Sequence, residues 1–180
     1  MLHPTVLDVF QPRRLIRHRV HETPLRPSAW LSSVTGGDVR LKIESANLTG
    51  SFKIRGAINA ALRLSEHINT QTPTLVTASA GNHGRALALA AEQLGLSCVV
   101  VTPATGPGPK KNAIRRHGAN LNTDHADYDL AERHAREFAD SEGGIYVSPY
   151  NHPDVIAGAG TIGLEIVESL PSCDVAIVPL

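Results

Sequence analysis

The residues with the clearest chemical potential surround one lysine, Lys53. Gly50 permits a tight turn, and Ser51 is a favourable residue for capping a helix. The apolar residues that follow recur with helical spacing, so we predict a helix that starts at Ser51 and carries Lys53 in its first turn. The positive end of the helix dipole and partial burial both disfavour an ammonium ion there. A neutral lysine can attack a carbonyl and form a Schiff base. The alternative is an ordinary surface lysine at a helix start.

A second group of small and polar residues lies further along the chain. A short predicted strand, Thr74–Thr77, leads into the segment Ser79–His83, and a helix rich in Ala and Leu follows over Arg85–Leu94. A loop at a helix N-terminus presents free backbone N–H groups and a positive dipole to an anion. Ser79 and Asn82 add side-chain hydrogen-bonding groups. The pattern predicts an anion-binding loop, with an ordinary strand-to-helix turn capped by Asn82 as the alternative.

Strands and helices alternate along most of the chain, which predicts an α/β fold of open parallel sheets with helices on both faces. The expected strands are Val39–Glu44, Thr74–Thr77, Ser97–Thr102, Asn120–Thr123, Gly144–Ser148 and Ser172–Leu180. The expected helices are Val6–Val20, the segment from Ser51, Arg85–Leu94, Lys110–His117 and Asp124–Ala139. Pro12 must kink or shorten the first of these helices. Gly158, Gly160 and Gly163 are expected where helices approach other elements closely.

The segment Thr49–Ala57 (TGSFKIRGA) resembles the cofactor-lysine motif of the fold type II pyridoxal-phosphate enzymes. Within them it is most similar to the serine/threonine dehydratase group, and matching spacing continues through nearly the whole chain. The resemblance implies pyridoxal 5′-phosphate as cofactor, Lys53 as the catalytic and cofactor-holding residue, and Phe52 and Asn82 as cofactor contacts. It also implies that a substrate carboxylate is bound by Ser79, Ala80, Gly81, Asn82 and His83.

The same resemblance implies that L-threonine or L-serine is dehydrated and deaminated to a 2-keto acid and ammonia. Racemases of the family commonly carry a second serine where this chain has Ala80, and that serine delivers a proton from the face opposite the lysine. Alanine has no proton to give, so we expect elimination rather than racemisation. One alternative is a serine racemase-like or other β-eliminating enzyme. An alternative of another class is a non-catalytic remnant or a partner-binding fragment.

In the family, two lobes face each other across a cofactor cleft. By resemblance, residues 1–48 and 146–180 form a partial larger lobe, and residues 49–145 form the smaller lobe. The family's glycine-rich phosphate loop would follow Leu180, so the chain resembles the amino-terminal half of a dehydratase. We therefore expect an incomplete larger lobe and little activity from the chain alone. We also expect a homo-oligomer or pairing with a complementary chain.

Composition argues against several other functions. Seventeen basic residues balance seventeen acidic ones, which argues against a nucleic-acid partner. No apolar run approaches the roughly 20 residues that span a bilayer, so no membrane partner is expected. The nine histidines lack metal-ligand spacing, which predicts no metal site. Cys98 and Cys173 lie in apolar runs, as expected of free buried thiols in a reducing cytoplasm. Lys110 and Lys111 are interpreted as solvated helix charges rather than ligands.

Overall fold

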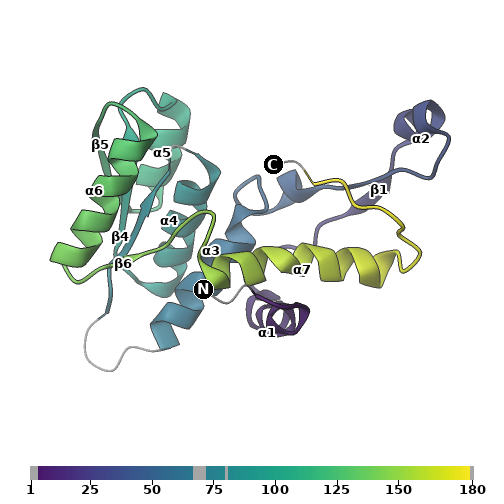
Figure 1. Cartoon of the computed structure of the whole chain (residues 1–180), viewed down its shortest axis with the longest axis horizontal. Helices are drawn as coiled ribbons and strands as arrows, with labels where there is room; N and C mark the ends of the chain where they lie inside the picture. The colour runs from purple at the N-terminus through teal and green to yellow at the C-terminus, as the bar shows by residue number, and fades with distance from the viewer. Residues whose placement is uncertain (1–3, 67–71, 80, 179–180) are drawn as a thin grey trace.

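The computed structural model describes residues 4–66, 72–79 and 81–178, which form an α/β fold (Figure 1). Its central element is a four-stranded parallel sheet in the order β5-β4-β3-β6. The strands of this sheet are β3 (Leu75–Ala78), β4 (Cys98–Pro103), β5 (Asn120–His125) and β6 (Ile145–Tyr146). The predicted α/β class with a parallel sheet is confirmed. A second sheet, which was not predicted, pairs β1 (Leu25–Pro27) with β2 (Arg40–Lys42) in antiparallel register.

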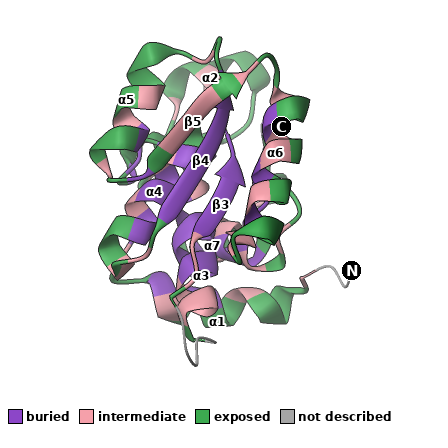
Figure 2. Ribbon diagram, turned by 90° about the vertical axis from the view of Figure 1, so that its left-hand side faces the viewer, coloured by how far each residue is buried: buried purple, intermediate pink, exposed green. Residues whose placement is uncertain are grey.

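Helices cover both faces of the parallel sheet, with α4 on one face and α6 on the other (Figures 1 and 2). The helices are α1 (Val6–Ile16), α2 (Ala29–Thr35), α3 (Lys53–Glu66), α4 (Asn82–Leu94), α5 (Gly108–Arg116), α6 (Tyr128–Ser141) and α7 (Pro153–Ser169), with a 3₁₀ turn η1 (Glu44–Ala46). Leu75 and Val100 pack into the core on the α4 side, whereas Val76 and Val101 pack into the core beneath α6. This alternation follows from the pleat of a strand, and burial of both faces explains the continuous apolar sequence of β4.

The two ends of the chain differ from the prediction. Helix α1 ends at Ile16 instead of Val20 and contains Pro12 within its span. Pro12 gives up one backbone hydrogen bond, but its fixed φ is compatible with a helix. No strand forms over residues 172–178, the described part of the predicted last strand. Strand geometry depends on a hydrogen-bonded neighbour, and no described strand forms backbone hydrogen bonds with this segment.

The predicted helix cap at Ser51 is wrong, and the alternative in which Asn82 caps the next helix is also wrong. The Oγ of Ser51 is buried without a hydrogen-bond partner among the described residues, and α3 begins only at Lys53. Asn82 is the first residue of α4 rather than its cap, because Gly81 precedes the helix without a side chain to bond. The N–H groups at the start of α4 are therefore not capped by a described side chain.

Three smaller expectations concern thiols, membranes and metals. Cys98 is buried as predicted, whereas Cys173 is partly exposed, and both thiols are free. Across residues 4–66, 72–79 and 81–178, no helix is both long and apolar enough to cross a membrane. The same residues contain no cluster of three His, Cys, Asp or Glu side chains that could hold a metal ion.

Helices α3 and α7 approach each other closely at two glycines. A Cβ atom on Gly158 would lie 2.5 Å from the carbonyl oxygen of Arg55 and 2.8 Å from the Cα of Gly56. A Cβ atom on Gly56 would lie 2.5 Å from the carbonyl oxygen of Val155. Real Cβ atoms do not come this close to backbone, so only glycine allows this distance between the two helices.

The other two glycines of α7 behave differently from each other. A Cβ atom on Gly160 would lie 2.8 Å from a methyl group of Val9 in α1, which confirms the predicted packing role. Nothing lies within 4 Å of the Cβ position of Gly163, so the prediction for that residue is wrong.

A buried charge cluster joins the same helices to the segment around β2. Arg55 is fully buried, and its guanidinium donates to Glu165 Oε1 at 2.6 Å and to Glu44 Oε1 at 2.9 Å. Lys42 Nζ donates to Glu165 Oε2 at 2.5 Å. Burial alone would raise the pKa of Glu165, but hydrogen bonds from Arg55 and Lys42 lower it below its ordinary value. Two cations thus balance two carboxylates, and the cluster holds the first turn of α3, where Lys53 lies.

We predict that Gly158→Ala destabilises the fold by roughly 1–3 kcal/mol, because the added methyl group overlaps the backbone of α3. Gly163→Ala is the matched control in the same helix. It meets open space, and the higher helix propensity of alanine should stabilise the fold by up to about 1 kcal/mol. Urea unfolding followed by circular dichroism measures both variants. Equal stability of the two would show that the glycine contact does not hold α3 against α7.

We predict that Glu165→Gln destabilises the fold at pH 7 by about 3 kcal/mol or more, because the buried cations lose their partner. The folded-state pKa of Glu165 lies below its unfolded value, so this contribution is complete above the unfolded value of about 4.3. It is lost as the pH falls through the folded value, and the difference from wild type should then close.

The control for the charge cluster is Asp38→Asn, which breaks an exposed pair with Arg40 and should cost no more than about 1 kcal/mol. Unfolding free energies measured from pH 7 into the acid range decide the question. A difference between Glu165→Gln and wild type that stayed constant over this range would contradict an ionised cluster.

Candidate active site

The strand order of the parallel sheet marks one edge as a candidate site. From β3, the chain adds β4 and then β5 on one side and returns to place β6 on the other side. In open α/β sheets, ligands bind outside the carboxyl ends of the strands, at the point where the order reverses. Here that point lies between β3 and β6. The residues that leave these strands are Ser79 after β3 and Val147–Pro149 after β6.

Lys53 reaches this edge from the first turn of α3. Its Nζ donates a hydrogen bond to the carbonyl oxygen of Pro149 at 3.1 Å. The ring centroids of Phe52 and Tyr150 lie 5.0 and 5.5 Å from the same nitrogen, within the range of cation–π contacts. The side chain is half-buried, and burial lowers the pKa of Lys53 below its ordinary value. The neutral amine is therefore more populated than in a free lysine, as the sequence predicts.

The predicted carboxylate loop ends at the same segment. The Oγ of Ser79 accepts a hydrogen bond from the N–H of Gly81 at 3.2 Å. The Nε2 of His83 lies 3.4 Å from the carbonyl oxygen of Val147. Burial, and next the nearby charge of Lys53, lower the pKa of His83 to about 4, so its ring is neutral at pH 7. Lys53 and His83 therefore meet the same stretch of backbone after β6.

Of the remaining predicted residues, two lie at the rim of this edge and one lies outside the described residues. Asn82 is exposed at the start of α4, and Phe52 is also partly exposed. Ala80 lies outside the described residues. Sequence reasoning missed the carbonyl of Pro149 and the ring of Tyr150. The sequence predicts a strand over 144–148, and ligands bind outside the carboxyl ends of parallel strands. That rule would have indicated Pro149 and Tyr150, which follow this strand.

Unsatisfied polar atoms test whether pyridoxal phosphate suits this edge. Near the starts of α3 and α4, four buried side-chain atoms have no partner among the described residues: Thr49 Oγ1, Ser51 Oγ, His83 Nδ1 and Arg85 Nε. Buried polar groups are normally hydrogen-bonded, so this group favours a ligand that brings polar atoms of its own. The half-buried amine and the positive end of α4 suit an aldehyde and an anionic group. The residues present therefore fit the cofactor.

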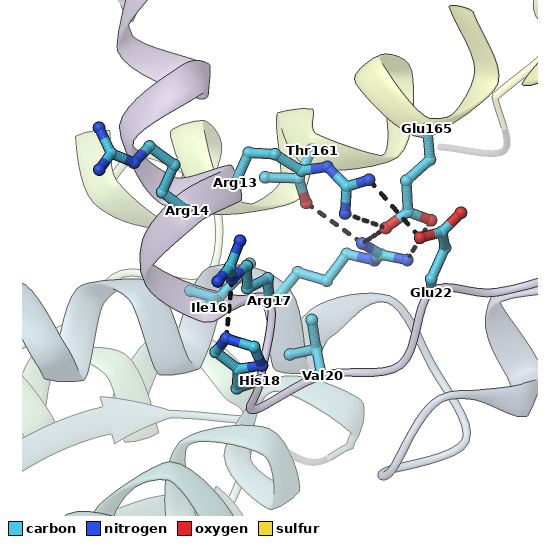
Figure 3. A pocket seen from close by; sticks show the side chains of 10 residues that line it. Arg13, Arg14, Ile16, Arg17, His18, Val20, Glu22, Thr161 and Glu165 are labelled. Atoms are coloured by element: carbon cyan, nitrogen blue, oxygen red, sulfur yellow. Dashed lines mark hydrogen bonds and ion pairs between the residues drawn. The ribbon is translucent and has the colours of Figure 1, made fainter. Parts of the chain in front are cut away.

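An arginine-rich cavity of about 570 Å³ lies elsewhere, between α1, α7 and the segment after α1 (Figure 3). Arg13 points toward Glu165 at 3.5 Å and pairs with Glu168 at 2.9 Å. Arg17 donates a hydrogen bond to His18 at 2.8 Å. Arg13 is thus paired with carboxylates, whereas Arg14 and Arg17 form no ion pair within the described residues. The lining contains none of the predicted site residues. Arg55 and Glu165 line the cavity, so it borders the buried charge cluster.

Comparisons with known proteins agree with the resemblance in the sequence. The chain is 42% identical over 176 residues to the L-threonine ammonia-lyase of Thermotoga maritima, which covers 98% of this chain and 43% of that protein. It is 38% identical over 174 residues to the serine racemase of Bos taurus, with 96% of this chain and 52% of that protein covered. A solved structure of a pyridoxal 5′-phosphate-dependent aspartate racemase matches with a TM-score of 0.88 at 33% identity. That match covers 97% of this chain and 54% of that one.

The chain spans about half the length of the curated relatives it matches. The family model described as pyridoxal-phosphate dependent enzyme matches residues 16–180. Because that match takes in all but the first residues of the sequence, the chain belongs to the family of pyridoxal-phosphate dependent enzymes.

Proposed function

We propose that this chain carries the lysine side of an ammonia-lyase that converts L-threonine or L-serine to a 2-keto acid and ammonia. The observation that carries the proposal is the environment of Lys53. Its amine is half-buried, has a lowered pKa and lies at the carboxyl edge of the sheet next to the positive end of α4. The name of the relative at 42% identity, L-threonine ammonia-lyase, supports this substrate class.

Each predicted site residue has a role in the proposal. Lys53 holds pyridoxal phosphate, Phe52 packs beside it, and the side chain of Asn82 bonds its ring hydroxyl. The substrate carboxylate is held by the loop residues Ser79, Ala80, Gly81, Asn82 and His83. The free N–H groups at the start of α4 serve this purpose because no described side chain caps them.

Proton transfer falls to Lys53. When bound, pyridoxal phosphate supplies an electron sink that makes the α-hydrogen of an amino acid acidic. Once the substrate amine has displaced it from the cofactor, the neutral Nζ of Lys53 accepts that proton, which its lowered pKa permits at pH 7 more readily than in a free lysine. The β-hydroxyl departs as water, and uptake of one water then yields the keto acid and ammonia. His83 is neutral and largely buried, so we do not assign it the role of a second base.

The proposal includes an arrangement of lobes and partners. Residues 1–48 and 146–180 belong to a larger lobe, and residues 49–145 form a smaller lobe. The enzyme acts in the cytoplasm, and the two free thiols suit a reducing compartment. Self-association or pairing with a complementary chain is supported by exposed apolar side chains on α1: Val6, Leu7 and Phe10 are 52–76% exposed.

The first test is to reduce the chain with borohydride in the presence of pyridoxal phosphate and to map the labelled peptide by mass spectrometry. We expect the label on Lys53. At pH 7 its labelling rate should exceed that of the other three lysines by roughly ten-fold for each unit by which its pKa is lowered. Lys53→Ala should remove the label, whereas Lys111→Ala should keep it. Preferential labelling of another lysine would overturn the site assignment.

Serine racemase is the second candidate function, because a relative of that name is 38% identical. Ala80, which lies outside the described residues, argues against it by residue type alone. A positioned general acid contributes about 10²–10⁴-fold, so we expect wild-type racemisation of L-serine to be slower than elimination by at least ~10²-fold. Ala80→Ser should raise the yield of D-serine in chiral chromatography. Abundant D-serine from the wild-type enzyme would show that another group donates the proton.

A further inference from the structure

Lys110 lies beside the loop that precedes α4, although the sequence suggests only a solvated helix charge. A methyl group placed on Gly81 would lie 3.6 Å from Nζ and 3.9 Å from Cδ of Lys110. The ammonium group from α5 therefore approaches the loop at the point where any other residue would carry a side chain. Gly81 leaves this space open between the loop backbone and the ammonium group.

The charge of Lys110 has no compensating carboxylate nearby in the described parts of the chain. None of the ion pairs between described residues includes Lys110. Its neighbour Lys111 differs, because Lys111 Nζ donates to the carbonyl oxygen of Ala104 at 2.6 Å. Only the first of the two adjacent lysines thus directs its charge at the loop.

A second observation indicates that a polar ligand belongs beside this loop. His83, in the first turn of α4, is only 3% exposed, and its Nδ1 has no partner among the described residues. Its ring is neutral, so it adds no positive charge of its own. The α4 N-terminus, Lys110 and the nearby charge of Lys53 all contribute a positive field at the loop, and such a field suits an anion.

We propose that Lys110 binds a carboxylate of the amino-acid substrate from the α5 side of Gly81. The inference rests on the proposed function, since it assumes that the loop holds an amino acid. Lys110 brings a full positive charge to the carboxylate, which the backbone N–H groups of the loop do not carry. The carboxylate is either the α-carboxylate or the side-chain carboxylate of a 3-hydroxy dicarboxylic amino acid. Both sources share the same chemistry, and one experiment separates them.

The experiment measures binding of two unreactive probes, butyrate and succinate, to the full chain by shifts of the Gly81 and Asn82 amide signals in NMR. Lys110→Ala should weaken succinate about ten-fold, as expected for one charge-assisted hydrogen bond, and Lys110→Arg should restore most of the binding. An equal loss for butyrate assigns Lys110 to the α-carboxylate. A loss confined to succinate assigns it to the side-chain carboxylate.

Lys111→Ala is the matched control and should bind both probes like wild type. The inference is overturned if Lys110→Ala binds like wild type, if Lys111→Ala causes the same loss, or if wild type binds neither probe. Circular dichroism checks that each variant is folded. Borohydride trapping at Lys53, run on the same samples, separates the two proposals: normal trapping with no effect of Lys110 refutes only this inference, whereas failed trapping refutes the proposed function.

Discussion

The position of Lys53 depends on how closely α3 and α7 can approach each other. Both the backbone and the side chain of Arg55 are held in place. Its carbonyl oxygen lies against Gly158, and its guanidinium bonds Glu44 and Glu165. A buried charge cluster of this kind gains little net stability, because desolvation offsets most of the attraction. Its effect here is to set the rotation of α3 about its own axis. Successive helical residues are about 100° apart, so Lys53 and Arg55 are separated by roughly 200°. With Arg55 turned into the cluster, Lys53 is turned away from it, toward the sheet edge.

The strand order provides the surface that Lys53 meets. Because β6 returns to the far side of β3, the backbone after β6 passes beside the backbone after β3. The carbonyl oxygen of Val147 accepts a hydrogen bond from Thr77 Oγ1 at 2.8 Å, which ties this segment to β3. The same carbonyl faces His83, and two residues later the carbonyl of Pro149 accepts from Lys53. The backbone carbonyls of this short stretch therefore align the lysine with the loop.

The sequence predicts the parts of this arrangement that are local. The motif around Lys53, the loop before α4 and the apolar strands each follow from a few consecutive residues, and the structure contains the helices and strands expected around them. What fails depends on distant partners. The helical pattern at Ser51 and Asn82 does not reveal which hydroxyl or amide finds an N–H group. Gly163 resembles Gly158 in sequence, yet only Gly158 faces another backbone. The last predicted strand has the right composition, but a strand also needs a neighbour.

Lys53 and Lys110, the two lysines of the proposed site, show why residue type alone cannot assign a role. Lys53 is half-buried, loses hydration and has a lowered pKa, which suits it to accept a proton. Lys110 is exposed on α5, beside the loop at Gly81, where its side chain is open to a carboxylate from solvent. The proposed function combines anion binding with proton removal, and it would use one exposed amine for the anion and one half-buried amine for the proton. The two proposed roles thus differ because Lys53 is half-buried and Lys110 is exposed. That difference in burial comes from the positions of α3 and α5.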